Sequence, residues 1–74
     1  MNTSQLIAFL NSIQVGDLDA IQGKLRQARE ACEELAQPEL SSTLQEAADA
    51  LSALDVRTYK KRVATVISRL GHVR

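Results

Sequence analysis

The sequence predicts an all-α protein, built as a small antiparallel helical hairpin array or a bundle of three to four helices. Apolar residues recur along the chain in steps of three and four, which is the spacing of one helix face. The phase of this spacing breaks at short polar segments, where turns are expected. No stretch of useful length alternates apolar and polar residues, so strands are not expected. The 74 residues predict a single helical domain over 1–74.

The first helix is expected over residues 4–15. Its apolar positions are Leu6, Leu10 and Ile13, flanked by Ile7 and Phe9. Thr3 or Ser4 is the expected N-cap, because a hydroxyl oxygen can accept a hydrogen bond from a free N–H group of the first turn. Gly16 is expected to end the helix.

The second helix is expected over residues 17–37 and has the longest apolar seam. Its positions are Leu18, Ile21, Leu25, Ala28, Cys32 and Leu35, in alternating steps of three and four. Asp17 is the expected N-cap. Pro38 separates this helix from the next one, because proline cannot continue a helix interior but fits a first turn.

The last two helices are expected over 39–54 and 56–70, with seams at Leu40, Leu44, Ala47, Leu51 and Leu54 and at Val56, Tyr59, Val63, Val66, Leu70 and Val73. A continued third seam would fall on Thr58 and Lys61, which are polar, so a turn near Asp55 is expected. Asp55 is the expected N-cap, and Leu54 and Tyr59 have the spacing of a hydrophobic staple around it. One kinked helix is the alternative. The short connections predict antiparallel neighbours.

The predicted core is short of bulky side chains. Hydrophobic residues make up 45% of the chain, but many are alanines, and the only aromatic residues are Phe9 and Tyr59. Alanine favours helix and buries little area, and a chain this short holds a modest core. We therefore expect self-association or a protein partner to complete the seams. The residues expected to carry this packing or partner contact are Leu25, Leu44, Leu51, Tyr59, Val63 and Leu70.

A second stripe of small residues lies on the far side of the second helix, at Ala20, Gly23, Gln27 and Ala31. A glycine inside a helix costs roughly 1 kcal/mol relative to alanine, and small residues let another helix approach closely. The stripe is therefore either a second interface or an exposed alanine-rich face, and the sequence favours neither.

Charge is unevenly distributed along the chain. Residues 1–55 carry all nine acidic residues, whereas residues 56–74 carry six of the nine basic residues and no acid. Nucleic-acid binding would use the basic residues Arg57, Lys60, Lys61 and Arg62 against phosphates. Wound as a helix, these side chains do not form one stripe. Pairing of Arg62 and Arg69 with acids of a neighbouring helix, such as Glu46, is favoured over nucleic acid.

The residue types offer little for catalysis or metal binding. The single histidine, His72, falls after the last helix, and the single cysteine, Cys32, falls in an apolar seam. One cysteine and one histidine cannot form a zinc site of thiolate and imidazole ligands within one chain. We therefore expect no enzyme activity, no cofactor, no bound metal and no small-molecule substrate. Acidic pairs such as Glu46 and Asp49 are expected to form a solvated face.

Cellular location follows from the same features. A lone cysteine indicates a reducing compartment. The apolar stretch from Leu6 to Leu10 is too short to span a membrane and has no basic segment before it. The sequence predicts a cytoplasmic protein that makes no membrane contact.

The predicted function of the chain is a non-enzymatic helical interaction or oligomerisation module, with a small nucleic-acid-binding or regulatory protein as the alternative.

Overall fold

The computed structural model describes residues 2–13 and 17–72, and all regular structure within them is helical. The helices are α1 (Thr3–Ser12), α2 (Leu18–Glu34), α3 (Pro38–Ser52) and α4 (Val56–Leu70). The predicted all-α fold is therefore confirmed, and the last two helices are separate. α1 and α2 end a few residues before the expected positions. The expected stop signal at Gly16 lies outside the described residues.

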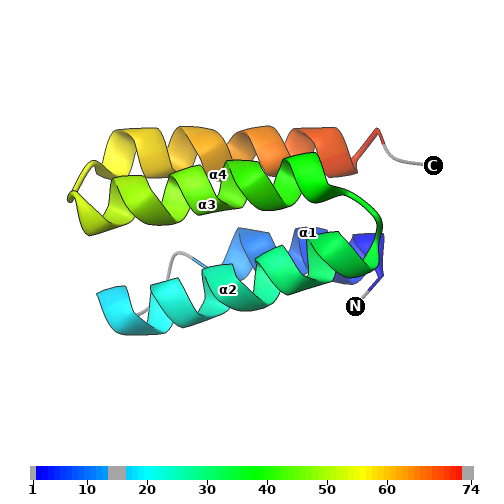
Figure 1. Ribbon diagram of the computed structural model, residues 1–74, viewed down its shortest axis with the longest axis horizontal. Coiled ribbons are helices and arrows are strands. Elements are labelled where there is room, and N and C mark those ends of the chain that lie inside the picture. The colour runs from blue at the N-terminus through cyan, green and yellow to red at the C-terminus, as the bar shows by residue number, and fades with distance from the viewer. Residues whose placement is uncertain (1, 14–16, 73–74) are drawn as a thin grey trace.

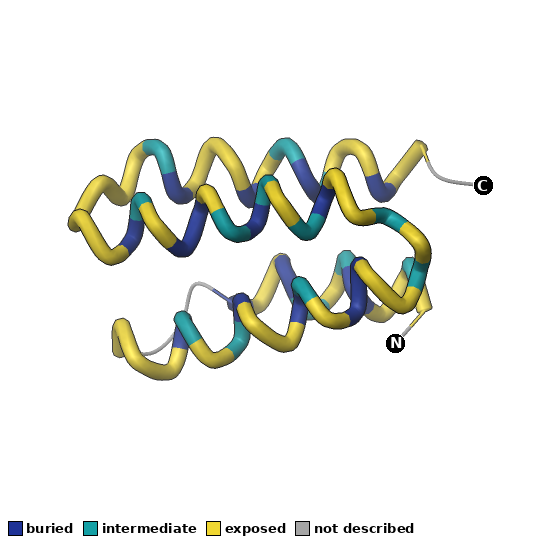
Figure 2. The backbone as a smooth tube through the Cα atoms, in the orientation of Figure 1, coloured by how far each residue is buried: buried dark blue, intermediate teal, exposed yellow. Residues whose placement is uncertain are grey.

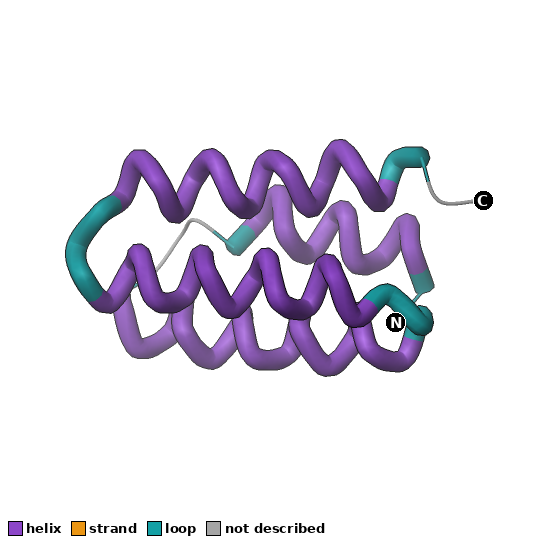
Figure 3. Tube along the Cα trace, turned by 45° about the horizontal axis from the view of Figure 1, so that its top comes forward, coloured by secondary structure: helices purple, strands orange, loops and turns teal. Residues whose placement is uncertain are grey.

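The helices form a closed up-down-up-down bundle (Figures 1 and 3). Each helix packs on the next one in the chain, and α1 packs on α4 to close the ring. The bundle measures 33 × 18 × 16 Å and is longest along the helices. The start of α2 and the α3–α4 turn lie at one end of the bundle, and the α2–α3 turn lies at the other (Figure 1).

Aliphatic side chains from all four helices fill the core. Each helix turns a buried stripe toward the bundle axis (Figure 2). The small residues Ala28, Ala31, Ala47 and Ala48 are at most 6% exposed. Alanines at these positions allow the helix backbones to approach closely, so the modest side chains of this sequence still close around one another.

A capping box starts α1, at a different residue from the expected one. Asn2 Oδ1 accepts a hydrogen bond from the Gln5 backbone N–H (2.8 Å), and the Asn2 N–H donates to Gln5 Oε1 (3.0 Å). The expected N-caps, Thr3 and Ser4, are therefore wrong, because this reciprocal pair begins the helix one residue earlier.

Two aspartates cap α2 and α4 as expected. Asp17 Oδ1 accepts from the Ala20 N–H (2.8 Å), and Asp55 Oδ1 accepts from the Thr58 N–H (3.2 Å). α3 instead begins with Pro38 in its first turn and has no side-chain cap.

The α2–α3 and α3–α4 turns share one geometry, the Schellman motif. Ala36 and Leu54 adopt left-handed backbone conformations, with φ of 59° and 62°. In each turn the following N–H donates back across the helix end: Gln37 to the Cys32 carbonyl (2.8 Å) and Asp55 to the Ala50 carbonyl (2.8 Å). Glycine usually occupies the left-handed position, because a side chain there costs roughly 1–2 kcal/mol.

The left-handed turn also decides where Leu54 points. Its side chain is 71% exposed, whereas Tyr59 is 3% exposed and lies in the core. The expected hydrophobic staple between these two residues is therefore wrong, because the reversed backbone at Leu54 turns its side chain to solvent.

Side-chain hydrogen bonds link α2 to α3. Gln22 Nε2 donates to the Ala48 carbonyl (3.0 Å) and to Ser52 Oγ (3.0 Å). Two helical turns further along α2, an Arg29 guanidinium N–H donates to Gln45 Oε1. These contacts join α2 and α3 at their solvent-facing edge and fix how far one helix is shifted along the other.

Candidate interaction surfaces

The six seam residues expected to carry packing or partner contacts all lie inside the bundle. Leu25, Leu44, Leu51, Tyr59, Val63 and Leu70 are between 0 and 3% exposed and belong to one core cluster. They pack on residues of their own chain, so none of them is available to a partner while the bundle is closed. A partner surface must be sought among other residues.

The small-residue stripe of α2 is split between surface and core. Ala20, Gly23 and Gln27 are exposed, and a Cβ added to Gly23 would meet no atom within 4 Å. Ala31 is only 4% exposed. It lies on the opposite flank of α2 from Arg29, which faces α3, and so it is directed toward α1. The stripe therefore does not form one continuous exposed surface.

The four basic residues of α4 are exposed but are not gathered on one face. Arg62 is directed toward α3, where its Nε lies 3.4 Å from Glu46 Oε2. Lys60 lies about 200° around the helix from Arg62, on the other side of α4. Arg57 and Lys61 lie between these two directions. The expected pairing of Arg62 with an acid of a neighbouring helix is confirmed at Glu46.

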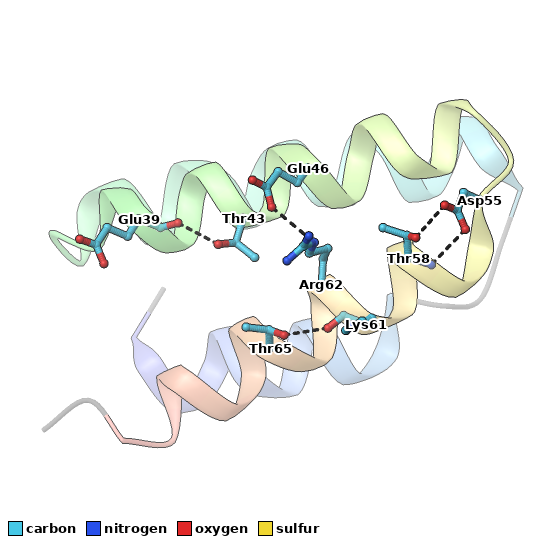
Figure 4. A network of polar contacts seen from close by, with 8 residues as sticks. All are labelled: Glu39, Thr43, Glu46, Asp55, Thr58, Lys61, Arg62 and Thr65. Carbon is cyan, nitrogen blue, oxygen red and sulfur yellow. Dashed lines mark hydrogen bonds and ion pairs between the residues drawn. The ribbon is translucent and has the colours of Figure 1, made fainter.

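A regular pattern of side chains covers the outer surface where α3 and α4 lie side by side (Figure 4). We call it the α3–α4 face. It consists of Glu39, Thr43, Glu46 and Ala50 on α3 and of Thr58, Arg62, Thr65 and Arg69 on α4, with Lys61 at its edge. Figure 4 draws all of these residues except Ala50 and Arg69. Both rows step by four, three and four residues, so each row stays on one side of its helix.

The two rows of the α3–α4 face lie in register. The helices are antiparallel, and Glu46 pairs with Arg62. A residue a given number of positions before Glu46 therefore lies at the same height along the bundle axis as the residue that number of positions after Arg62, and we call two such residues level. Thr43 is level with Thr65, and Glu39 is level with Arg69. Both acids of the face therefore lie level with an arginine. Small residues occupy the other two levels: Thr43 and Thr65 between the charged levels, and Ala50 and Thr58 beyond Glu46 and Arg62.

The threonines of the face satisfy their hydroxyls within their own helices. Thr43 Oγ1 donates to the Glu39 carbonyl (3.0 Å), and Thr65 Oγ1 donates to the Lys61 carbonyl (2.9 Å). A hydroxyl bonded to its own helix needs no further donor or acceptor. The levels between the charges therefore behave as small, weakly polar steps that a second surface can cover without losing hydrogen bonds.

Three exposed apolar residues lie at one end of the bundle. Leu18 and Val56 are each 47% exposed, and Leu54 is 71% exposed. Leu18 begins α2, Leu54 lies in the α3–α4 turn and Val56 begins α4. Figure 1 places this turn and the start of α2 at the same end of the bundle. A few exposed apolar residues are common on protein surfaces.

A shallow hollow lies on α1, lined by Gln5, Ala8, Phe9 and Ser12.

Burial raises the pKa values of two groups in the core. Desolvation raises the pKa of the Cys32 thiol to about 11, with a smaller contribution from the charge of Glu33. The thiol is therefore protonated near neutral pH, which is the unreactive form. Burial also raises the pKa of Tyr59, whose hydroxyl has no hydrogen-bond partner in the described part of the chain.

The pKa of Asp55, the exposed N-cap of α4, is lowered. Hydrogen bonds from the side chain and the backbone of Thr58 lower the pKa of Asp55, with a smaller effect from Arg57. Asp55 is thus held in its charged form, which suits the positive N-terminal end of a helix.

Within residues 2–13 and 17–72, no three histidine, cysteine, aspartate or glutamate side chains come together to hold a metal ion. No helix of that part of the chain is long and apolar enough to cross a membrane.

Comparison with protein-family models, with curated proteins and with solved structures finds no match for this chain. The function must therefore be argued from the surfaces themselves.

Sequence reasoning from the apolar seams missed the α3–α4 face. The signal was present, because Glu39, Thr43, Glu46 and Ala50 repeat the steps of the core seam on another side of the same helix. This second, polar repeat is recognised only once α4 is known to be the antiparallel neighbour of α3 and the Glu46–Arg62 pair fixes the relative height of the two helices.

Proposed function

We propose that this chain is a non-enzymatic helical module that binds protein, and that the α3–α4 face is its contact surface. The observation that carries the proposal is the register of that face: a row of acids beside a row of arginines, with small residues at the levels between. Such a surface fits another protein surface on which charges of opposite sign alternate in the reverse order.

The same register argues against nucleic acid as the partner. A polyphosphate presents charge of one sign, and it would meet Glu39 and Glu46 together with the arginines beside them. Lys60, on the other side of α4, cannot reach the same backbone as Arg62. Protein binding is therefore the better-supported function of the two.

Location in the cytoplasm forms part of the proposal. Cys32 is a free, fully buried thiol, and proteins with a single unpaired cysteine are typical of reducing compartments.

Site-specific photo-crosslinking in the producing cell tests this function. A photoreactive amino acid replaces Ser42 or Ser68, two exposed residues beside the α3–α4 face, or Gln27 on α2 as the matched control. We expect nuclease-resistant adducts that join the 8.1 kDa chain to another polypeptide from the two face positions, and few adducts from position 27. Nuclease-sensitive adducts, or equal yields from all three positions, would overturn the proposal.

A further inference from the structure

We propose that the partner of the α3–α4 face is the same face of a second copy of this chain. This inference rests on the proposed function and names its partner. It predicts a symmetric dimer in which α3 of each copy lies over α4 of the other.

The symmetry follows from the arrangement of charges. A twofold axis parallel to the helices places α3 of one copy over α4 of the other and preserves the level of every residue. Glu46 then meets the partner copy's arginine row at the level of Arg62 and Lys61, and Glu39 meets it at the level of Arg69. A twofold axis across the helices would instead place acids over acids.

Each charged level would then hold four side chains of alternating sign. At the outer level these are the Glu39 and Arg69 of each copy, and at the inner level the Glu46 and Arg62 of each copy. Both Glu46 (59% exposed) and Arg62 (44% exposed) are still largely in solvent and can bind further charges. The helix directions agree as well, because α3 would lie antiparallel to the partner copy's α4.

The two uncharged levels of the face permit close approach. Thr43, Ala50, Thr58 and Thr65 are small and half-buried, and the hydroxyls of the three threonines are bonded within their own chain. Small side chains at these two levels let opposing helices pack without leaving voids or unpaired donors.

The size of the face limits the contact area of the dimer. The whole bundle measures 33 by 18 Å, so a contact over its full length would bury at most about 1,200 Å² over both copies, the lower end of specific interfaces. We therefore expect a reversible dimer with a Kd on the order of micromolar, weakened by salt because its polar contacts are exposed pairs.

Sedimentation equilibrium of the purified full chain tests the proposal through charge reversal at the outer level. The variants are Glu39→Lys and Arg69→Glu, measured separately and mixed. Each variant alone turns both cross-copy Glu39–Arg69 contacts into repulsions, so its dimer should be about tenfold weaker or more. In the mixture every cross-copy contact is again between opposite charges, so a heterodimer of near wild-type strength should form. No contact within one chain can produce that rescue.

The matched controls are Glu30→Lys and Arg26→Glu, which make the same charge changes at exposed positions of α2. They should dimerise like the unaltered chain, and circular dichroism should show all variants equally helical. A monomer at every concentration, absence of rescue in the mixture, or equal weakening by the α2 controls would overturn the dimer. Protein adducts at Ser42 and Ser68 that join the chain only to other proteins would overturn the dimer and leave the proposed function standing.

Discussion

The two hairpins that share α3 close with the same turn but are joined by different polar contacts. Between α2 and α3, Gln22 and Arg29 reach across to the Ala48 carbonyl, Ser52 and Gln45. Between α3 and α4, the threonine hydroxyls bond within their own helices, and the contact across is the surface pair of Glu46 and Arg62.

This difference separates a structural edge from a candidate binding surface. The Gln22 amide N–H groups and one guanidinium N–H of Arg29 are bonded to α3, so a partner could use these groups only by breaking existing bonds. On the α3–α4 face the charged groups extend into solvent at regular levels. The surface best suited to a partner is therefore the one whose polar groups contribute least to holding the bundle together.

The largest expected effect comes from α3, because both hairpins depend on it. Leu44 is fully buried, and Leu44→Ala should lower the free energy of unfolding by about 2–5 kcal/mol, a large part of the total for a domain of this size. Urea denaturation followed by circular dichroism measures the loss. The control Leu54→Ala removes a 71% exposed side chain and should change stability by about 0.5 kcal/mol or less. Similar losses in both variants would contradict this description of the core.

Most of the fold could be predicted from the sequence because burial follows the helix period. Leu25, Leu44 and Leu70 occupy seam positions, and the seams alone require helices that turn one stripe toward a shared core. Asp17 and Asp55 were predicted as caps because their side chains precede apolar runs. Local chemistry of this kind depends on a few neighbouring residues.

The positions that could not be predicted depend on contacts between distant segments or on backbone geometry. Ala31 is buried because α1 packs against that flank of α2, which no pattern within α2 reveals. Leu54 continues the third seam in the sequence but is the left-handed residue of the turn, so it is exposed. The expected need for a partner is not evident at the buried seam positions, because small residues let four short helices cover them, whereas the seam residues Leu18, Leu54 and Val56 remain exposed.

The shared turn offers the second test. Ala36→Gly and Leu54→Gly should each raise the free energy of unfolding by about 1 kcal/mol, because glycine adopts positive φ without the strain that a side chain causes. The control Ala53→Gly, one residue before Leu54 at a φ of −85°, should lower stability instead. Equal gains in the two hairpins would show that their turns are equivalent. A loss at position 36 or 54 would mean that the backbone there is not left-handed.

The smallest expected effects concern the polar contacts that distinguish the two hairpins. Gln22→Ala removes hydrogen bonds to Ala48 and Ser52 and should cost about 1 kcal/mol, relative to Gln27→Ala at an exposed position of the same helix. Glu46→Gln should cost about 0.5 kcal/mol or less, because both partners of that ion pair are largely exposed.

The salt dependence of the two stability losses distinguishes the ion pair from the hydrogen bonds, because salt screens exposed charges and leaves neutral hydrogen bonds almost unchanged. Urea denaturation of both variants at low and high salt, at a concentration low enough to keep the chain monomeric, measures each loss. The cost of Glu46→Gln should vanish at high salt, whereas the cost of Gln22→Ala should persist. If the ion pair contributed more to stability than the Gln22 contacts, Glu46 and Arg62 would be part of the bundle's own support, and the α3–α4 face would lose its distinction from the α2–α3 edge.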